Sequence, residues 1–343
     1  MTQSASLWVR VVEVIHETPN AHSLVLEPAA ESAPLEYHPG QFLTLRVPSG
    51  RDSDAARCYS LCSSPQCGEK PKVTVKRTAG GYASNWICDQ VVEGSVLEVL
   101  RPAGTFTPNS LDEDLLLVAG GSGIIPVMSI LKSCLRSGSG SVTLLYANRD
   151  EDSIIFADEL ATLAREFGDR LTVVHWLESV QGVPSESWLR ALIAPRADRR
   201  AFLCGPEPFM DLVGNVLDGL GVPGDRVMVE RFSSLTGNPF DEQPVELDGS
   251  GPSSTVEVEL DGEARTITWP HRNRLLDVLR EDGLDAPFSC REGACSACAC
   301  MLLEGDVDLA NNEILDSADL ADGVILACQA TPLTDHVKVT YDV

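Results

Sequence analysis

Four cysteines near the end of the chain limit its possible folds more than any other feature. Cys290, Cys295 and Cys298 follow the spacing C-x4-C-x2-C, and Cys328 follows further along the chain. This spacing is the one that holds a plant-type [2Fe–2S] cluster. Four thiolates also supply the soft ligands that iron and sulfide require. We therefore predict that these four cysteines are the metal ligands of a [2Fe–2S] cluster.

The residues around these cysteines favour iron over zinc. A structural zinc site is the alternative, but zinc sites usually show paired C-x2-C spacings. Cys300 lies in a strand-like run directly after the loop, so we interpret it as a small buried side chain and not as a fifth ligand. Small residues between the cysteines would let backbone N–H groups approach the sulfur atoms: Gly293, Ala294, Ser296 and Ala297.

Cysteine count and charge exclude several classes of protein. The 343 residues include 11 cysteines, an odd number that does not suggest a disulfide framework in an oxidising compartment. The formal net charge of −25 argues against binding to nucleic acid or to an anionic membrane, and makes a basic protein partner more plausible. Arg10 and Glu13 interrupt the first apolar run, so no secretory signal is expected. The expected location is the cytoplasm.

The pattern of apolar residues divides the chain into parts. Short alternating runs between residues 7 and 108, punctuated by Gly and Pro, predict an antiparallel β-barrel. After residue 114, apolar strands alternate with helical segments, which predicts a doubly wound parallel sheet. These strands are expected at 115–119, 142–147, 171–176 and 201–204, with helices at 124–136, 157–167, 185–193 and 206–219.

The last third of the chain begins with a change of composition. Residues 236–254 contain three prolines, three glycines and four carboxylates but no basic residue, as expected of a linker. Beyond it, a hairpin around 261–263 and a helix near 275–280 precede the cysteines, which predicts a small α+β domain. The expected parts are therefore a barrel at 1–110, an α/β domain at 111–235, an acidic linker at 236–254 and the α+β domain at 255–343.

Three glycine turns each join a strand to a helix. One follows Lys76 and contains Gly81 and Ser84, and another contains Gly120, Gly121 and Gly123. A third begins at Cys204 and Gly205. The N–H groups at such a helix start suit a diphosphate. A glycine turn that only connects two elements, with Ser84 as a helix cap, is the alternative.

Arg57-Cys-Tyr-Ser60, together with the glycine turn after Lys76, resembles the flavin motif R-x-Y-S of the ferredoxin-NADP reductase family. The resemblance implies that the barrel binds FAD. Arg57 would hold the FAD pyrophosphate, Tyr59 would lie against the isoalloxazine ring, and Ser60 would hydrogen-bond flavin N5. Lys76, Gly81 and Ser84 would belong to the phosphate-binding segment.

The same resemblance assigns the α/β domain to NADH. Gly120, Gly121, Gly123 and Gly205 would bind the dinucleotide, Cys204 would lie beside the nicotinamide C4, and Glu230 would place a carboxylate nearby. Phe232 would cover the flavin. Ser60, Cys204 and Glu230 are thus the expected catalytic residues. One departure is Ile125, which stands where the family usually has threonine, so a hydroxyl is missing near the flavin–nicotinamide contact.

The order of barrel, nucleotide domain and ferredoxin is similar to that of reductases serving multicomponent oxygenases, and implies a β-grasp fold for the ferredoxin domain. NADH delivers two electrons as hydride whereas the cluster accepts one, so FAD must lie between them. The expected function is electron transfer from NADH through FAD and [2Fe–2S] to a Rieske-type terminal oxygenase. Three carboxylates after the second strand of the α/β domain, Asp150, Glu151 and Asp152, favour NADH over NADPH, although Arg149 opposes this.

Several strings look most similar to the reductase components that serve 3-ketosteroid 9α-hydroxylases in steroid degradation: 57–65, 144–150, 175–178, 286–293 and 339–342. Reductases of a phenylacetyl-CoA epoxidase or an aromatic-ring hydroxylase stay open as alternatives, and so does a zinc-stabilised binding protein. Residues 255–343 carry 18 Asp and Glu against 6 Lys and Arg. We therefore expect an acidic docking surface for the oxygenase, with Glu304, Asp306 and Asp308 near the cluster loop.

Overall fold

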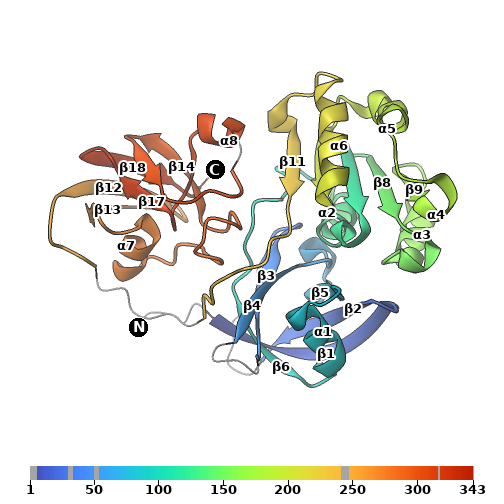
Figure 1. The fold of residues 1–343 in the computed structure, drawn as a ribbon, viewed down its shortest axis with the longest axis horizontal. Coiled ribbons are helices and arrows are strands. Elements are labelled where there is room, and N and C mark those ends of the chain that lie inside the picture. Colours follow the sequence, from blue (N-terminus) through green and yellow to red (C-terminus); the bar gives the residue numbers. More distant parts are fainter. Residues whose placement is uncertain (1–5, 30–33, 50–53, 241–246, 316, 343) are drawn as a thin grey trace.

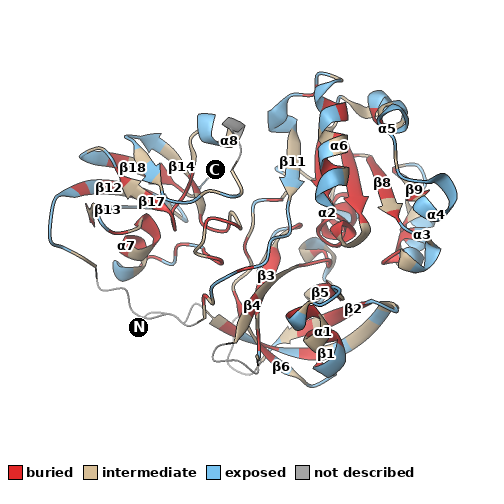
Figure 2. Cartoon of the chain, in the orientation of Figure 1, coloured by how far each residue is buried: buried red, intermediate tan, exposed pale blue. Residues whose placement is uncertain are grey.

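The computed structural model describes residues 6–29, 34–49, 54–240, 247–315 and 317–342. Three large sheets in these residues form three separate parts of the molecule, which follow one another along the chain (Figure 1). Buried residues lie on the inner faces of the sheets and helices, while exposed residues cover their outer sides (Figure 2). No helix in the described part of the chain is long and apolar enough to cross a membrane.

The first part is the predicted antiparallel barrel. Its six strands lie in the order β4-β3-β6-β1-β2-β5, and every paired neighbour is antiparallel. Alternate side chains point inward because successive residues of a strand face opposite sides. The strands and the one helix are β1 (Ser6–Thr18), β2 (Ala21–Pro28), β3 (Phe42–Val47), β4 (Ala55–Ser60), β5 (Lys72–Lys76), β6 (Val96–Leu100) and α1 (Tyr82–Gln90).

The second part is the predicted parallel α/β domain. Its strands lie in the order β11-β10-β7-β8-β9, and apolar cores cover both faces of the sheet. The strands are β7 (Leu115–Gly120), β8 (Val142–Asn148), β9 (Leu171–Leu177), β10 (Arg200–Cys204) and β11 (Val227–Glu230). The helices are α2 (Ile124–Ser137), α3 (Ala157–Glu166), α4 (Glu178–Gln181), α5 (Glu186–Ile193) and α6 (Glu207–Asp218).

The third part is the predicted α+β domain. Its sheet has the order β13-β12-β18-β14-β16, with a separate β15-β17 pair. Asp261 and Gly262, both with positive φ, form the two-residue turn of the predicted β12–β13 hairpin. The elements are β12 (Ser253–Leu260), β13 (Glu263–Pro270), α7 (Leu275–Glu281), β14 (Ala299–Glu304), β15 (Val307–Leu309), α8 (Ser317–Ala321), β16 (Val324–Leu326), β17 (Ala330–Pro332) and β18 (His336–Thr340).

The segment expected to be a linker, 236–254, is only partly separate from these folds. Residues 236–240 contact both the barrel and the third part of the molecule, and β12 begins at Ser253, inside the expected linker. Residues 241–246 lie outside the described part of the chain. Composition therefore predicted an irregular segment here, but gave no sign of the contacts that its first residues make.

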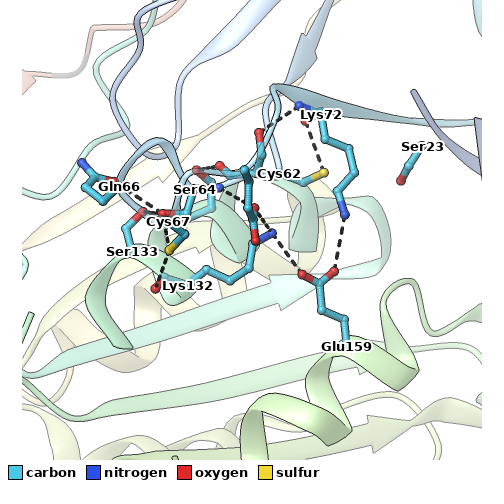
Figure 3. Close-up of polar contacts among 12 residues, drawn as sticks. Ser23, Cys62, Ser64, Gln66, Cys67, Lys72, Lys132, Ser133 and Glu159 are labelled. Atoms are coloured by element: carbon cyan, nitrogen blue, oxygen red, sulfur yellow. Dashed lines mark hydrogen bonds and ion pairs between the residues drawn. The ribbon is translucent and has the colours of Figure 1, made fainter. Parts of the chain in front are cut away.

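A buried polar network joins the barrel to the α/β domain (Figure 3). Lys132 of α2 is 1% exposed, and its Nζ lies 2.7 Å from a Glu69 carboxylate oxygen and 3.0 Å from one of Glu159. Lys72 of β5 approaches Glu159 at 3.6 Å. Ser64 and Ser133 hydrogen-bond across the same boundary at 2.8 Å. This network fixes the barrel against α2 and α3.

The contact between the barrel and the third part combines small apolar groups with a few polar pairs, among them Thr105–Ser296 at 3.3 Å and Arg101–Asp285 at 3.6 Å. One group of side chains contains Ala56, Leu235, Cys290 and Ala294, and a second contains Phe42, Ala103 and Ala297. A buried hydrogen bond, 2.6 Å between the hydroxyl oxygens of Thr44 and Ser289, joins β3 to the cysteine loop. The cysteine loop thus lies directly on the barrel.

Candidate functional site

A cavity of about 360 Å³ opens between the barrel and the end of β11. Its walls come from β4, from β5 and the turn after it, from α1, and from the chain that follows β11. Seven residues were expected to contact or cover the flavin. All of them line this cavity: Arg57, Tyr59, Ser60, Lys76, Gly81, Ser84 and Phe232. Tertiary structure therefore brings them together although Phe232 comes from another domain.

The lining offers the groups that a dinucleotide needs. Arg57 Nη1 donates to the Leu235 carbonyl at 3.1 Å, and the Ser84 hydroxyl accepts from the Thr78 N–H at 3.1 Å. A Cβ on Gly81 would lie 2.9 Å from the Thr78 Cβ, so only glycine fits beneath the turn. Burial lowers the pKa of Lys76 and raises that of Tyr59. Cationic, hydroxyl and aromatic groups thus line the same cavity.

Ile125, at the start of α2, lines the same cavity and is buried. Its apolar side chain occupies the position at which the resembled family usually places threonine. The cavity therefore lacks that hydroxyl, as the sequence indicated.

A second cavity, of about 750 Å³, lies beside the first and is basic. Lys76 and Arg77 reach it from the barrel, and Arg149 reaches it from the end of β8 in the α/β domain. Sequence reasoning did not assign Arg77 or Asn85 to a ligand, and it treated Arg149 only as a signal on nucleotide choice. Only the packing of the two domains puts Arg149 beside Lys76, so no local pattern could reveal the pair.

The glycines of the α/β domain allow three backbone segments to meet. A Cβ on Gly123 would lie 1.9 Å from the Cys204 carbonyl oxygen, and one on Gly205 would lie 2.9 Å from the Gly120 nitrogen. Gly121 has a φ of 53°. A third cavity, of about 350 Å³, opens beside these turns and is lined by Gly120, Gly121, Ala147, Asn148, Arg149, Trp176, Glu178, Pro206 and Phe209, among others.

Cys204 and Glu230 end two neighbouring parallel strands and are paired in register. Burial raises the pKa of Glu230 to about 8. Burial and the nearby Glu230 carboxylate raise the pKa of the Cys204 thiol well above its usual range. Neither residue is among those that line the three cavities just described. The structure therefore brings two of the three expected catalytic residues to one another, while the third, Ser60, lines the flavin cavity.

The cysteine loop presents backbone N–H groups to its sulfur atoms. The N–H groups of Glu292 and Ala294 donate to Cys290 Sγ at 3.3 and 3.4 Å. The Cys290 N–H donates to Cys295 Sγ at 3.3 Å, and the Cys328 N–H donates to Cys298 Sγ at 3.4 Å. Such donors stabilise thiolates. The loop thus has the donor pattern that an anionic iron–sulfur cluster requires.

The thiols of Cys290, Cys295 and Cys298 in this loop lie beside the thiol of Cys328, which comes from a later segment. Cys290 contacts Cys295 and Cys328, and these neighbours lower the pKa of Cys290. Cys328 also contacts Cys298 and lowers its pKa. In the described residues, no group of three or more His, Cys, Asp or Glu side chains is placed to hold a metal ion directly. The arrangement is thus one of contacting thiols surrounded by N–H donors.

Cys58 connects the flavin cavity to the cysteine loop, a position that sequence reasoning did not assign. It lines the first cavity, and its Sγ lies 3.6 Å from the Ser289 hydroxyl beside Cys290. It also packs with Cys295 in both apolar groups of this contact. Arg-x-Tyr-Ser motifs leave this residue undefined, so no sequence signal could single it out.

Three families cover most of the chain. Residues 9–107 match the oxidoreductase FAD-binding domain, residues 117–215 match the oxidoreductase NAD-binding domain, and residues 258–333 match the 2Fe-2S iron-sulfur cluster binding domain. These matches agree with the barrel cavity, the glycine turns of the α/β domain and the cysteine loop. They also exclude the zinc-stabilised binding protein as an alternative.

Similar proteins extend over the full chain. The ferredoxin reductase component of 3-ketosteroid-9-alpha-monooxygenase is 52% identical in Rhodococcus rhodochrous and 53% identical in Mycolicibacterium smegmatis, and each alignment covers 98% of this chain and 97% of the relative. One of the subunits of 1,2-phenylacetyl-CoA epoxidase from Escherichia coli is 33% identical over 100% of this chain and 99% of its own.

A solved structure shares the arrangement. Phthalate dioxygenase reductase, described as a modular structure for electron transfer from pyridine nucleotides to [2Fe–2S], matches with a TM-score of 0.60 and 24% identity over 98% of both chains. The chain therefore belongs to the family of oxidoreductases with FAD-binding, NAD-binding and 2Fe-2S domains that includes the ferredoxin reductase components of 3-ketosteroid-9-alpha-monooxygenases.

Proposed function

We propose that this protein is the reductase component of a 3-ketosteroid 9α-monooxygenase, and that it passes electrons from NADH through FAD and its [2Fe–2S] cluster to a Rieske-type oxygenase. One observation carries the electron path. The barrel cavity is bounded by Ser122 and Ile125 of the nucleotide domain on one side and by Cys58, which contacts the cysteine loop, on the other. A flavin in this cavity lies between the donor and the acceptor.

The chain's own residues hold and orient the flavin. Arg57 and Lys76 supply positive charge for the diphosphate, and Gly81 and Ser84 form the turn against which it lies. Tyr59 and Phe232 would pack against the ring system, and the Ser60 hydroxyl would hydrogen-bond flavin N5. When bound, FAD accepts two electrons as a hydride and releases them singly to a one-electron carrier.

Cys204 and Glu230 form the nicotinamide side of the site in this proposal. Glu230 holds a proton at neutral pH because burial raises its pKa to about 8. A neutral carboxyl at this position avoids an uncompensated buried charge beside the reacting rings. Gly120, Gly121, Gly123 and Gly205 leave room for the dinucleotide backbone at the strand ends.

The cluster ligands are Cys290, Cys295, Cys298 and Cys328, and the N–H groups directed at their sulfur atoms support this assignment. We also propose a cytoplasmic location. Its support is that none of the eleven cysteines, all of which lie in the described residues, is in a disulfide, as expected in a reducing compartment.

The oxygenase is proposed to dock on the acidic surface beside the cluster. Glu304, Asp306 and Asp308, which are exposed around the β14–β15 turn, would face a basic patch on the partner. A weak encounter guided by charge suits a carrier that must bind and leave in each turnover.

The choice of nucleotide is proposed to be NADH. Asp150, Glu151 and Asp152 follow β8 and would repel the 2′-phosphate of NADPH, whereas Arg149 would attract it. We expect kcat/KM for NADH to exceed that for NADPH by about tenfold, the ratio that corresponds to about 1.4 kcal/mol of discrimination. Equal values for the two nucleotides would contradict this assignment.

The decisive experiment combines a spectrum with a reconstitution. The purified protein should show flavin and iron–sulfur absorbance that NADH bleaches anaerobically. It should then support turnover when mixed with a 3-ketosteroid 9α-oxygenase and a 3-ketosteroid. Because the similar phenylacetyl-CoA epoxidase protein is 33% identical, the epoxidase oxygenase is the matched comparison. Faster turnover with the epoxidase would reject the steroid assignment but keep the reductase.

A further inference from the structure

The chain that leaves β11 runs between the barrel and the ferredoxin domain before it reaches the residues drawn in grey (Figure 1). We call residues Phe232–Phe240 the strap. Its first residues, Phe232, Ser233 and Ser234, line the flavin cavity. The strap therefore begins at the nicotinamide end of the site and continues toward the cluster.

The strap is bonded to the cysteine loop at three points. The Ser233 hydroxyl donates to the Ala294 carbonyl at 3.1 Å. The Thr236 N–H donates to Glu292 Oε2 at 3.0 Å, and the Gly237 N–H donates to Glu292 Oε1. Both oxygens of one carboxylate thus accept hydrogen bonds from consecutive backbone groups of the strap.

The strap is also bonded to the barrel. The Asn238 side-chain amide donates to the Asp54 carbonyl at 3.1 Å, and Arg57 donates to the Leu235 carbonyl at 3.1 Å. The Leu235 side chain is buried between Ala56 of β4 and Cys290 of the loop. The strap therefore connects the flavin-binding strand to the cluster loop through nine consecutive residues.

Glu292 is an unexpected residue for its position, because it lies two residues from Cys290 and places a carboxylate close to an anionic cluster. Like charges at short range repel. Two N–H donors to the carboxylate compensate for that cost, since hydrogen bonds to charged groups are the stronger ones. The backbone N–H of the same residue donates to Cys290 Sγ at 3.3 Å. Glu292 thus joins the ligand loop to the strap directly.

We propose that Glu292 is a positioning residue that latches the ferredoxin domain to the strap and so sets the separation between the flavin cavity and the cluster loop. This inference rests on the proposed internal electron transfer from flavin to cluster. The thin contact between the two domains explains the need for a latch, because small apolar surfaces can slide. Electron-transfer rates fall with the separation of the two carriers, so a displaced cluster loop would slow the step several-fold.

Three variants test the latch. Glu292→Ala removes both acceptor oxygens, and Glu292→Gln keeps one while removing the same charge. Glu281→Ala is the matched control, because Glu281 is an exposed carboxylate of the same domain at the end of α7. All three change the net charge equally, so only the hydrogen bonds to the strap distinguish them.

The first measurement needs no electron transfer. Hydrogen–deuterium exchange of a peptide covering residues 232–240 should be faster in Glu292→Ala by about tenfold at two amides, the effect of losing a charged acceptor. Glu292→Gln should be intermediate and Glu281→Ala unchanged. Unchanged exchange in Glu292→Ala overturns the latch. If Glu292→Ala does not assemble its cluster, Glu292→Gln must still give faster exchange than the wild type, and unchanged exchange there overturns the latch as well.

The second measurement separates positioning from tuning of the cluster. In anaerobic stopped flow, NADH should reduce the flavin at the wild-type rate in Glu292→Ala, Glu292→Gln and Glu281→Ala. Flavin-to-cluster transfer should slow several-fold in Glu292→Ala and less in Glu292→Gln. The midpoint potential and EPR signal of the cluster should be equal in Ala and Gln variants. Equal slowing in both variants would assign the effect to charge and overturn the latch. A wild-type protein in which NADH reduces no cluster would instead reject the proposed function, and the exchange result would stand.

Discussion

The two junctions of the flavin barrel differ in their chemistry. Toward the α/β domain, the buried Lys132 forms ion pairs with the half-buried Glu69 and Glu159 (Figure 3). Toward the ferredoxin domain, small apolar side chains and the Thr44–Ser289 hydrogen bond form the inner part of the contact, with an exposed Arg101–Asp285 pair outside it. Buried charges must meet their partners, so any sliding of the first junction is costly. Apolar contacts tolerate sliding, and this is why the second junction needs the strap.

This difference matches the two transfers that the junctions serve. Hydride transfer requires close alignment of two rings, since a near-attack geometry contributes a large share of the rate. The ion network fixes the register of the domains that bring those rings together. On the other side only an electron must cross, and the cluster must also remain accessible to the oxygenase. A thinner junction with a defined latch serves both needs.

The largest effect is expected from Cys328→Ser, which removes one cluster ligand. One-electron reduction of the oxygenase or of cytochrome c should fall about 100-fold or more, because the cluster no longer assembles. NADH-to-ferricyanide activity should stay within about twofold, since the ferredoxin domain is a separate unit. Steady-state assays with both acceptors measure this. Equal loss of the two activities would mean that losing the cluster also disturbs the flavin barrel, and it would contradict the separation of the two domains.

The next largest effect is expected on stability, at the junction between the barrel and the α/β domain. Lys132→Met removes the buried cation, so Glu69 loses its ion-pair partner and Glu159 keeps only Lys72, at 3.6 Å. Because solvent still reaches both carboxylates, the loss should be about 2 to 3 kcal/mol of unfolding free energy, the low end for a broken buried pair. The flavin should be released at a lower urea concentration than in the wild type, as followed by flavin fluorescence.

Arg136→Met is the control for this prediction. Arg136 also lies on α2, but its ion pair with Glu166 of α3 is exposed, so the loss of unfolding free energy should be below about 1 kcal/mol. A Lys132→Met protein as stable as that control would show that the ion network does not fix the junction.

A smaller effect concerns Glu230, which ends β11 where the strap begins. Burial raises the pKa of Glu230 to about 8, above its usual value of 4.5. Between these values the native protein holds a proton that the unfolded chain has released, so stability falls as pH rises from about 4.5 to about 8. The full shift corresponds to about 4 kcal/mol over this window. Because Glu230 is only half-buried, solvent screening should reduce the loss, measured relative to Glu230→Gln, to roughly 2 kcal/mol. Urea unfolding of both proteins at pH 5, 6, 7 and 8 measures it, and parallel curves would contradict a buried carboxyl.

The smallest effect is expected from salt. It should distinguish the two junctions inside the protein from the contact between the protein and its oxygenase. Salt screens exposed charges beyond a Debye length of about 10 Å at 0.1 M, so reductase-to-oxygenase transfer should slow several-fold as ionic strength rises. Flavin reduction and flavin-to-cluster transfer should stay flat, because both steps run within one chain and need no charge-guided encounter. Stopped-flow traces across a salt series give all three rates. A flat inter-protein rate would remove the proposed role of Glu304, Asp306 and Asp308.

Local patterns predicted most of the fold. The helices expected at 124–136, 157–167 and 206–219 are observed as Ile124–Ser137, Ala157–Glu166 and Glu207–Asp218. Amphipathic periodicity determines such elements within one segment. The Asp261-Gly262 turn was likewise predictable, because a two-residue hairpin turn needs residues that accept positive φ. The short α4 and the contacts of residues 236–240 had no comparable local signal.

The candidate site divides in the same way. Four cysteines, the R-x-Y-S string and the glycine turns were visible because ligand spacing and tight turns are local requirements of the chemistry. The pairing of Arg149 with Lys76, the position of Cys58 and the latch of Glu292 on the strap were not visible. Each joins segments that lie far apart in sequence, so each depends on how complete domains pack.

The sequence by itself therefore determined the carriers, their order and the type of fold that binds each one, because cofactor-binding motifs and secondary structure arise from neighbouring residues. Tertiary structure alone decided how the carriers' sites face one another. Thr44 and Ser289 are 245 residues apart, yet their hydroxyl oxygens lie 2.6 Å apart. No local propensity encodes such a contact, since it exists only after the barrel and the ferredoxin domain have buried their shared apolar surface.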